Sequence, residues 1–364
     1  MLSRAVYSVG QAAPHGNSIM EMIARDKDNA GFGCTAHLQV VHIALAANHR
    51  YLPGLLATLS SMLLASRSRE RLAFHVLAEG LTDEDEHVVS SMATRCGAAL
   101  PVEFLHPDMG PIRRTFKDYK GSHAAFLRLY LCDLMPTEDW VIYADVDTLW
   151  FRDPCELWDE RDDSVSVLWC LDCPSIATGV REYSLQFNPR FDTNRYACSG
   201  VVLMNLRRMR ETGFISKCEN FVKKWGTPFF VDQDILNTIC LNDAKLLDRR
   251  WDCMMPEHGA AHAVVIHCNG IGGHFDIPMR SWRPQYYVWY RFYADVVLNE
   301  PERPVASILR RCIFWALGSF YPRHEPIRLL CRRFHPRWTD QIERTLFFAW
   351  LWRHAKWWRG WRSI

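Results

Sequence analysis

Two carboxylates, one residue apart, end the apolar stretch DWVIYADVDTLWF, Asp139 to Phe151. Residues i and i+2 of an extended segment point to the same side, so Asp145 and Asp147 are predicted to present their carboxylates together. Carboxylates held close repel each other, and one pKa rises unless a cation lies between them. The pair therefore predicts a place where a ligand binds.

Three interpretations of this pair remain open at the level of residue types. The acids could lie at a strand end that water solvates, as Asp often does in loops. They could hold a hard divalent ion and leave positions open for phosphate oxygens, and a later His would favour manganese over magnesium. The letters DVDTL also match a haloacid-dehalogenase-like phosphatase in which Asp145 attacks phosphate, although that motif normally opens its domain.

Strands and helices are predicted to alternate around these acids. Apolar runs predict strands, and apolar residues at helical spacing predict helices. The expected strands are 38–47, 72–80, 101–107 and 140–147, and the expected helices are 52–66, 81–97 and 121–135. This order predicts a doubly wound, Rossmann-like α/β domain, in which ligands bind beyond the carboxyl ends of the strands.

Further elements are predicted after the acids. Strands are expected at 196–206 and 263–270, and helices at 207–225 and 232–241. Gly213 is a predicted break in the first of these helices. In the helix at 81–97, Thr82 is a predicted N-cap with Asp85 three residues later.

Composition separates the C-terminal end from the rest of the chain. The 364 residues are 49% hydrophobic and 23% charged, which excludes disorder over the whole chain. From residue 303 onward there are 13 Lys and Arg against three Asp and Glu, and seven of the 15 Trp. We therefore expect a loose extension at 1–36, a main folded domain at 37–302 and a helical basic and aromatic region at 303–364.

Cysteine usage and hydropathy indicate the compartment. The 13 Cys are scattered through expected strands and helices, which predicts reduced thiols of a cytoplasmic protein. No signal-peptide core or membrane span is evident. The basic aromatic stretch 345–361 suits a helix on an anionic membrane surface, so the expected location is cytoplasmic or peripheral on the membrane's cytoplasmic face. Because residues 1–302 hold more acidic than basic residues, no nucleic-acid partner is expected.

Four blocks in order carry a family resemblance: HIALAANHRY, AAFLRLYLCDLMPTEDWVIYADVDTLW, SGVVLMNL with FVDQDILN, and VVIHCNG. The chain resembles glycosyltransferase family 8, retaining enzymes that include lipopolysaccharide galactosyl- and glucosyltransferases, from about residue 40 to about residue 275. The resemblance implies the GT-A fold, an α/β nucleotide-binding domain with a mixed central sheet. It also implies transfer of a glucose or galactose from a UDP-sugar to a glycan or lipid-linked acceptor, with Mn²⁺ or Mg²⁺.

The resemblance also implies roles for individual residues. Asp145, Asp147 and His267 look like the metal ligands. Asp232, Gln233 and Asp234 look like the catalytic segment beside the donor sugar. The remaining donor contacts are expected at Ala46, Asn48, Arg50, Arg128, Val146 and Gly270.

Two positions depart from the family pattern. Cys198 stands where the family usually has Asn or a similar polar residue, so a sugar contact is expected to be altered. Gly273 stands where the family has a Lys that binds the diphosphate. These departures motivate an alternative function, that of a catalytically weak nucleotide-sugar-binding protein.

Overall fold

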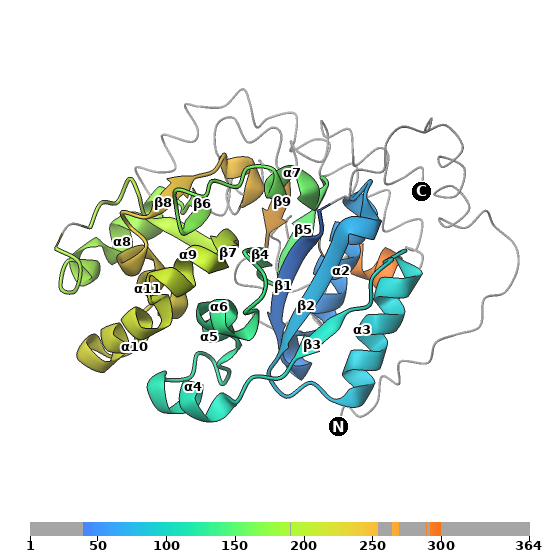
Figure 1. The fold of residues 1–364 in the computed structure, drawn as a ribbon, viewed down its shortest axis with the longest axis horizontal. Helices are drawn as coiled ribbons and strands as arrows, with labels where there is room; N and C mark the ends of the chain where they lie inside the picture. The colour runs from blue at the N-terminus through green and yellow to red at the C-terminus, as the bar shows by residue number, and fades with distance from the viewer. Residues whose placement is uncertain (1–38, 190, 254–263, 269–288, 290–291, 300–364) are drawn as a thin grey trace, which may run out of the picture. The chain divides into compact units, whose positions relative to one another are not determined.

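The computed structural model describes residues 39–189, 191–253, 264–268, 289 and 292–299 (Figure 1). The expected N-terminal extension and basic aromatic region lie outside these residues, and so do Gly270 and Gly273. The boundaries of the three expected regions and the membrane contact of the last one therefore stay predictions. Within the described residues, no helix is long and apolar enough to cross a membrane.

A mixed seven-stranded sheet forms the centre of the fold (Figure 1). β1, β2, β3 and β4 are mutually parallel, β7 runs antiparallel to both β4 and β6, and β8 pairs parallel to β6. In spatial order the strands are β3 (Glu103–Leu105), β2 (Leu72–Ala78), β1 (Val41–Ala47), β4 (Trp140–Ala144), β7 (Ala197–Asn205), β6 (Val167–Leu171) and β8 (Ala244–Leu246). The predicted α/β class with a mixed sheet is confirmed.

A small two-stranded sheet lies next to the end of β4. It joins β5 (Thr148–Trp150) to β9 (Val265–His267) in antiparallel register, with Thr148 opposite His267. This pairing brings the segment just after the two acids against a strand more than 100 residues later in the chain.

Helices cover both faces of the large sheet, because alternate residues of its strands are apolar on each side. On one side α2 packs on β1, and α3 and β5 pack on α2. On the other side α5, α9 and α11 pack on the sheet and α10 packs on α9 and α11. The helices are α2 (Leu52–Ala65), α3 (Asp83–Arg95), α4 (Met109–Thr115), α5 (Ala124–Leu127), α6 (Leu131–Leu134), α7 (Pro154–Trp158), α8 (Pro174–Ser184), α9 (Leu206–Glu211), α10 (Phe214–Trp225) and α11 (Val231–Ile239).

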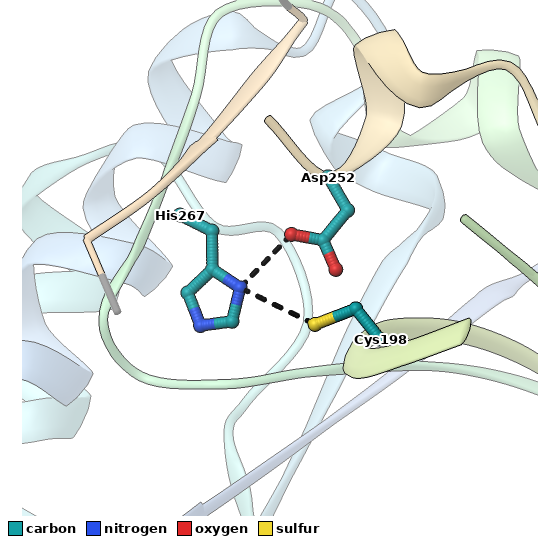
Figure 2. A group of neighbouring side chains, drawn as sticks. All are labelled: Cys198, Asp252 and His267. Atoms are coloured by element: carbon teal, nitrogen blue, oxygen red, sulfur yellow. Dashed lines mark hydrogen bonds and ion pairs between the residues drawn. The ribbon is translucent and has the colours of Figure 1, made fainter. Parts of the chain in front are cut away.

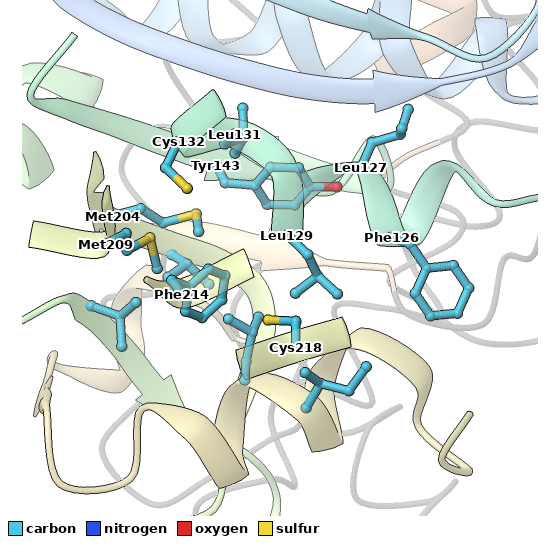
Figure 3. Close-up of a cluster of buried hydrophobic side chains, with 14 of the residues drawn as sticks. Phe126, Leu127, Leu129, Leu131, Cys132, Tyr143, Met204, Met209, Phe214 and Cys218 are labelled. Carbon is cyan, nitrogen blue, oxygen red and sulfur yellow. The ribbon is translucent and has the colours of Figure 1, made fainter. Parts of the chain in front are cut away.

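The second of these faces holds a large buried cluster (Figure 3). Tyr143 of β4 and Met204 of β7 meet Leu129, Phe214 and other helix side chains there, all nearly inaccessible to water. This packing fixes the segment around residue 128 against the strand that leads to the two acids.

Two predicted helices are interrupted in the structure, one of them at the predicted residue. The predicted break at Gly213 is confirmed, since that residue has φ +64° and separates α9 from α10. The helix predicted over 121–135 is not continuous: a 3₁₀ turn, η4 (Arg128–Tyr130), separates α5 from α6. The tighter turn coincides with Arg128, whose side chain is buried and held by ion pairs. Strands β5, β6 and β8 were not predicted.

The N-terminus of α3 carries the predicted cap. Asp85 N donates to Thr82 Oγ1 at 3.2 Å, and Thr82 N donates to Asp85 Oδ2 at 3.0 Å. The same Asp85 carboxylate contacts His49 Nδ1 at 3.0 Å. The cap therefore also supports the loop that follows β1.

We expect Thr82→Ala to lower the free energy of unfolding by roughly 0.5–2 kcal/mol, because it leaves a helix N–H without its acceptor. Urea unfolding measures the loss. Thr94→Ala, in the last turn of the same helix, is the matched control and should change stability by less. Equal effects of the two substitutions would contradict the capping role.

Candidate active site

Asp145 and Asp147 lie in the turn between β4 and β5, where backbone contacts fix both residues. Asp145 N donates to Gly200 O of β7 at 2.7 Å, and Cys268 N donates to Asp147 O at 2.7 Å. The acids were predicted on an extended strand, which is wrong: β4 ends at Ala144, and a turn brings the two carboxylates together.

His267, the last residue of β9, completes a group with these acids. Its Nε2 lies 3.1 Å from Asp147 Oδ1 and 3.9 Å from Asp145 Oδ2. The imidazole is 5% exposed, whereas Asp145 and Asp147 are 27% and 19% exposed, so the group is open on the side of the acids. The three residues that the sequence suggested as metal ligands are thus close enough to share one ion.

The charges in this group change the pKa values in opposite directions. Burial alone would lower the pKa of His267, but the carboxylates of Asp252 and Asp147 raise it well above its usual range. Burial would raise the pKa of Asp147, but the neighbouring His267 lowers it. The pKa of Asp145 is raised, by burial and by the charge of Asp147, although Arg128 opposes the rise. A protonated, positively charged His267 imidazole therefore relieves the repulsion between Asp145 and Asp147.

Arg128 connects the turn that carries Asp145 and Asp147 to α11. Its Nη2 lies 2.6 Å from Asp145 Oδ1, its Nη1 donates to Ser199 O at 2.5 Å, and its Nε lies 3.1 Å from Asp232 Oδ2. The guanidinium also stacks over the Tyr143 ring at 4.2 Å. The side chain is only 4% exposed, so its ion pairs are not those of a helix surface. It holds two carboxylates in place from within.

Asp232 keeps a buried oxygen that no hydrogen bond satisfies. Its Oδ2 faces Arg128, but the Nε–H of Arg128 donates to Ala125 O at 3.0 Å instead. Burial raises the pKa of Asp232 to about 6, with Arg128 lowering it and Asp145 raising it. The oxygen is therefore ion-paired with Arg128 but keeps a lone pair that no hydrogen-bond donor uses.

Gln233 and Asp234 are both held by hydrogen bonds, but Gln233 is half-buried whereas Asp234 is buried. Gln233 Nε2 donates to Asp172 Oδ2 at 2.8 Å and its Oε1 accepts from Ser199 N at 3.2 Å. Both oxygens of Asp234 are engaged, one by Tyr196 Oη at 2.7 Å and the other by Phe230 N at 2.8 Å. The structure therefore favours Asp234 as a support of α11.

Two features of this segment were missed in the sequence. Val231, at the start of α11, has φ +34°, a costly conformation for a β-branched residue. Asp172, between Cys170 and Cys173, orients Gln233. Its position within the letters CLDC, Cys170 to Cys173, is the signal in the sequence that could have drawn attention to it.

Asn48 and Glu79 lie together beyond the ends of β1 and β2. Asn48 Nδ2 donates to Glu79 Oε2 at 3.3 Å, which leaves Asn48 Oδ1 buried without a hydrogen-bond partner. Glu79 also accepts from His123 N at 2.8 Å and from Ala124 N at 3.2 Å. Glu79 was not singled out from the sequence. Its contact with Nδ2 fixes the Asn48 amide so that Oδ1 points away from Glu79.

The other expected donor contacts occupy the same edge of the sheet. Ala46 is buried near the end of β1, Val146 is buried between the two acids, and Arg50 is exposed on η2 (His49–Tyr51).

Cys198 lies behind His267 rather than on the open side. Its Sγ is 3.8 Å from His267 Nδ1, and Asp252 Oδ1 is 2.9 Å from the same nitrogen (Figure 2). Asp252, just after the 3₁₀ turn η5 (Arg249–Trp251), was not expected in the site. The cysteines among the described residues are buried and form no disulfide, as predicted.

Comparisons with known proteins identify the family of the chain. The sequence profile described as "Glycosyl transferase family 8" matches residues 42–272. General stress protein A of Bacillus subtilis (strain 168) is 25% identical over 59% of this chain and 74% of its own length. The lipopolysaccharide 1,2-glucosyltransferase of Escherichia coli is 24% identical over 59% of this chain and 63% of its own length. The chain thus covers less than two thirds of the latter enzyme.

Solved structures show the same fold. The galactosyltransferase LgtC, in complex with donor and acceptor sugar analogues, superposes with a TM-score of 0.59 at 19% identity. That superposition covers 73% of this chain and 98% of LgtC. The bifunctional glycosyltransferase WbbM gives a TM-score of 0.60 at 16% identity, over 75% of this chain and 52% of WbbM.

The fold is therefore that of the GT-A glycosyltransferases, as expected. The chain belongs to glycosyl transferase family 8. The predicted transferase class is confirmed at the level of the family, and the phosphatase interpretation of Asp145 is wrong.

Gly200 lies directly beneath the His267 ring. A Cβ at this position would come within 2.5 Å of His267 Nδ1. We expect Gly200→Ala to lower the free energy of unfolding by roughly 1–3 kcal/mol, because the ring must move in a packed interior. Urea unfolding measures the change.

Gly179→Ala is the control for this substitution. Gly179 lies on α8 with nothing within 4 Å of an added Cβ, so this variant should be as stable as wild type or up to about 1 kcal/mol more stable. If Gly200→Ala behaves in the same way, the close packing of the ring is refuted.

Proposed function

We propose that this protein is a metal-dependent retaining glycosyltransferase that moves a glucose or galactose from a UDP-sugar to a glycan or lipid-linked acceptor. The observation that carries the proposal is a continuous polar chain. It begins with the acids at the end of β4, continues through Arg128, and ends at Asp232 and Gln233 of α11. This chain would place the diphosphate and the sugar at adjoining positions.

The side-chain atoms of Asp145, Asp147 and His267 fit a divalent ion such as Mn²⁺ or Mg²⁺. Neighbouring ligands of an octahedral ion with bonds of about 2.1 Å lie about 3 Å apart. The measured separations of His267 Nε2 from Asp147 Oδ1 and Asp145 Oδ2 are 3.1 and 3.9 Å. Asp145 Oδ1 is occupied by Arg128 and Tyr143, which leaves Oδ2 for an ion. One nitrogen among oxygens favours manganese.

Asn48 supports uridine as the nucleoside. Its buried Oδ1 is an acceptor without a partner, and the N3–H of uracil is a donor that cytosine lacks at that position. The Glu79 contact fixes the amide so that the oxygen, rather than the NH₂ group, is offered.

The protein side chains would then act by holding charges and hydroxyl groups. A bound divalent ion would supply positive charge for the leaving diphosphate. Arg128 keeps Asp145 oriented toward that ion and keeps Asp232 charged in a buried place. Asp232 Oδ2 would accept a hydrogen bond from a hydroxyl of the donor sugar. Gln233 Oε1 would lie beside the anomeric carbon of that sugar. The family resemblance implies that the acceptor attacks from the face that UDP leaves, with net retention.

The acceptor is proposed from a relative, and the membrane contact is proposed from the sequence. A lipopolysaccharide glucosyltransferase among the relatives favours a glycan of the cell surface as acceptor. The proposed contact of the basic aromatic tail with an anionic membrane, and a location on the cytoplasmic face, rest on the sequence alone.

We expect Asp147→Ala to reduce transfer from UDP-glucose or UDP-galactose by roughly 100-fold or more, because the leaving group loses its charge partner. Metal-dependent binding of UDP should weaken in parallel when it is measured by calorimetry. Asp133→Ala, on the exposed side of α6, is the control and should keep wild-type values. Near-native transfer by Asp147→Ala in saturating manganese would show the assignment to be wrong.

We expect Asn48→Ala to weaken UDP binding by roughly 2- to 10-fold, the value of one hydrogen bond. The preference of the protein for UDP over CDP should shrink by a similar factor, because only UDP offers the N3–H. Asn194→Ala, at an exposed turn, is the control. Equal affinity of the wild-type protein for UDP and CDP would argue against a role of Asn48 in base selection.

A further inference from the structure

The two ring nitrogens of His267 face different groups of side chains. Nε2 faces Asp145 and Asp147, which we call the front site. Nδ1 faces Cys198 and Asp252, which we call the rear site (Figure 2). The front site accounts for the metal ligands of the proposed active site, whereas the proposed function assigns no role to Cys198 and Asp252.

The rear site has the composition of a metal site for thiophilic ions. One sulfur, one nitrogen and one carboxylate converge in it, and its three residues are between 2% and 4% exposed as whole residues. Asp252 Oδ2 is buried without a hydrogen-bond partner, although Oδ1 contacts His267. A buried carboxylate oxygen without a partner is unfavourable, and an ion between the three residues would satisfy it.

The distances allow an ion with small adjustments. Zinc bonds of about 2.3 Å to sulfur and about 2.0 Å to nitrogen place those two atoms about 3.5 Å apart in a tetrahedral shell. Cys198 Sγ and His267 Nδ1 are 3.8 Å apart, whereas His267 Nδ1 and Asp252 Oδ1 are 2.9 Å apart. To bind zinc, Cys198 Sγ needs to move slightly closer to His267 Nδ1, and the Asp252 carboxylate needs to move slightly away from it.

We propose that Cys198, Asp252 and His267 form a second metal site, which takes a thiophilic divalent ion such as Zn²⁺ or Cd²⁺ and opposes occupation of the front site. Binding displaces the proton of the Cys198 thiol and the proton on Nδ1. The ion bonds to Cys198 Sγ, Asp252 and His267 Nδ1, with a fourth position left to water or another ligand.

The opposition between the two sites follows from the shared imidazole. A neutral ring has one nitrogen with a free electron pair, so an ion at Nδ1 leaves the proton on Nε2. Both ions can bind together only if the ring loses both protons. A rear ion therefore weakens the front ion, and by linkage a front ion weakens the rear ion equally. This opposition depends on the proposed function of the front site, whereas rear-site binding does not.

Rear-site binding is tested with Cd²⁺, because the cadmium–thiolate bond absorbs in the ultraviolet and a bond to carboxylate or imidazole alone does not. The full chain, reduced and free of metal, is titrated with Cd²⁺. At saturation, the wild-type protein should show more cadmium–thiolate absorbance than Cys198→Ser. The difference should correspond to one additional equivalent of bound Cd²⁺. Cys96→Ser, which removes a buried thiol next to α3, is the control and should titrate like wild type.

Asp252→Asn keeps the thiol and is the second variant, so the test does not depend on how well Cys198→Ser folds. Its affinity for Cd²⁺ should fall roughly 10- to 100-fold, as with the loss of other groups that hold a metal in place. Absorbance that is equal in wild type and a folded Cys198→Ser, or an unchanged affinity in Asp252→Asn, would overturn the rear site.

The coupling is tested by electron paramagnetic resonance of Mn²⁺ bound to the wild-type protein. Substoichiometric Cd²⁺ should release bound Mn²⁺ from wild type and release much less from Cys198→Ser. Equal release from the two proteins would overturn the coupling. If Mn²⁺ does not bind at all, the front-site function fails while the absorbance result still decides the rear site.

Discussion

The repulsion between two neighbouring carboxylates, Asp145 and Asp147, governs the arrangement of the site. Two such charges in a partly buried turn are unfavourable unless cations face them. The structure supplies two cations from distant parts of the chain. Arg128 arrives from the broken helix against β4, and His267 arrives on β9. Much of the surrounding fold can be understood as the means of delivering these two side chains.

The cost of holding these cations is visible in the backbone. The helix around residue 128 tightens into a 3₁₀ turn, and Gly200 is needed because a side chain there would meet the His267 ring. Val231 adopts a positive φ just before Asp232. Such departures from regular geometry gather around the site, where positioning of charge outweighs local preference.

Much of this organisation could be predicted from the sequence, for identifiable reasons. The cap at Thr82, the break at Gly213 and the strands leading to the acids follow from local patterns of single residues. The grouping of Asp145, Asp147 and His267 could not come from such patterns, because 120 residues separate the last two. It was expected only because motifs of a known family occur in order.

What was missed depends on contacts that spacing does not encode. Asp252 and Asp172 are ordinary acids in the sequence, and only the tertiary structure places them against His267 and Gln233. Cys198 was noticed as a lost sugar contact, whereas the structure turns its sulfur toward the back of the imidazole. The extended geometry assumed for Asp145 and Asp147 was also wrong, because the strand ends at Ala144, three residues before its predicted end, and a turn brings the acids together.

The proposed function depends most on where a metal ion and a nucleotide bind. The most direct measurement is the anomalous scattering of manganese in crystals grown with Mn²⁺ and UDP. The account predicts one peak bonded to Asp145, Asp147 and His267 Nε2, with the diphosphate on the same ion and the uracil next to Asn48. A manganese peak away from these three residues, or UDP bound without it elsewhere on the protein, would contradict it.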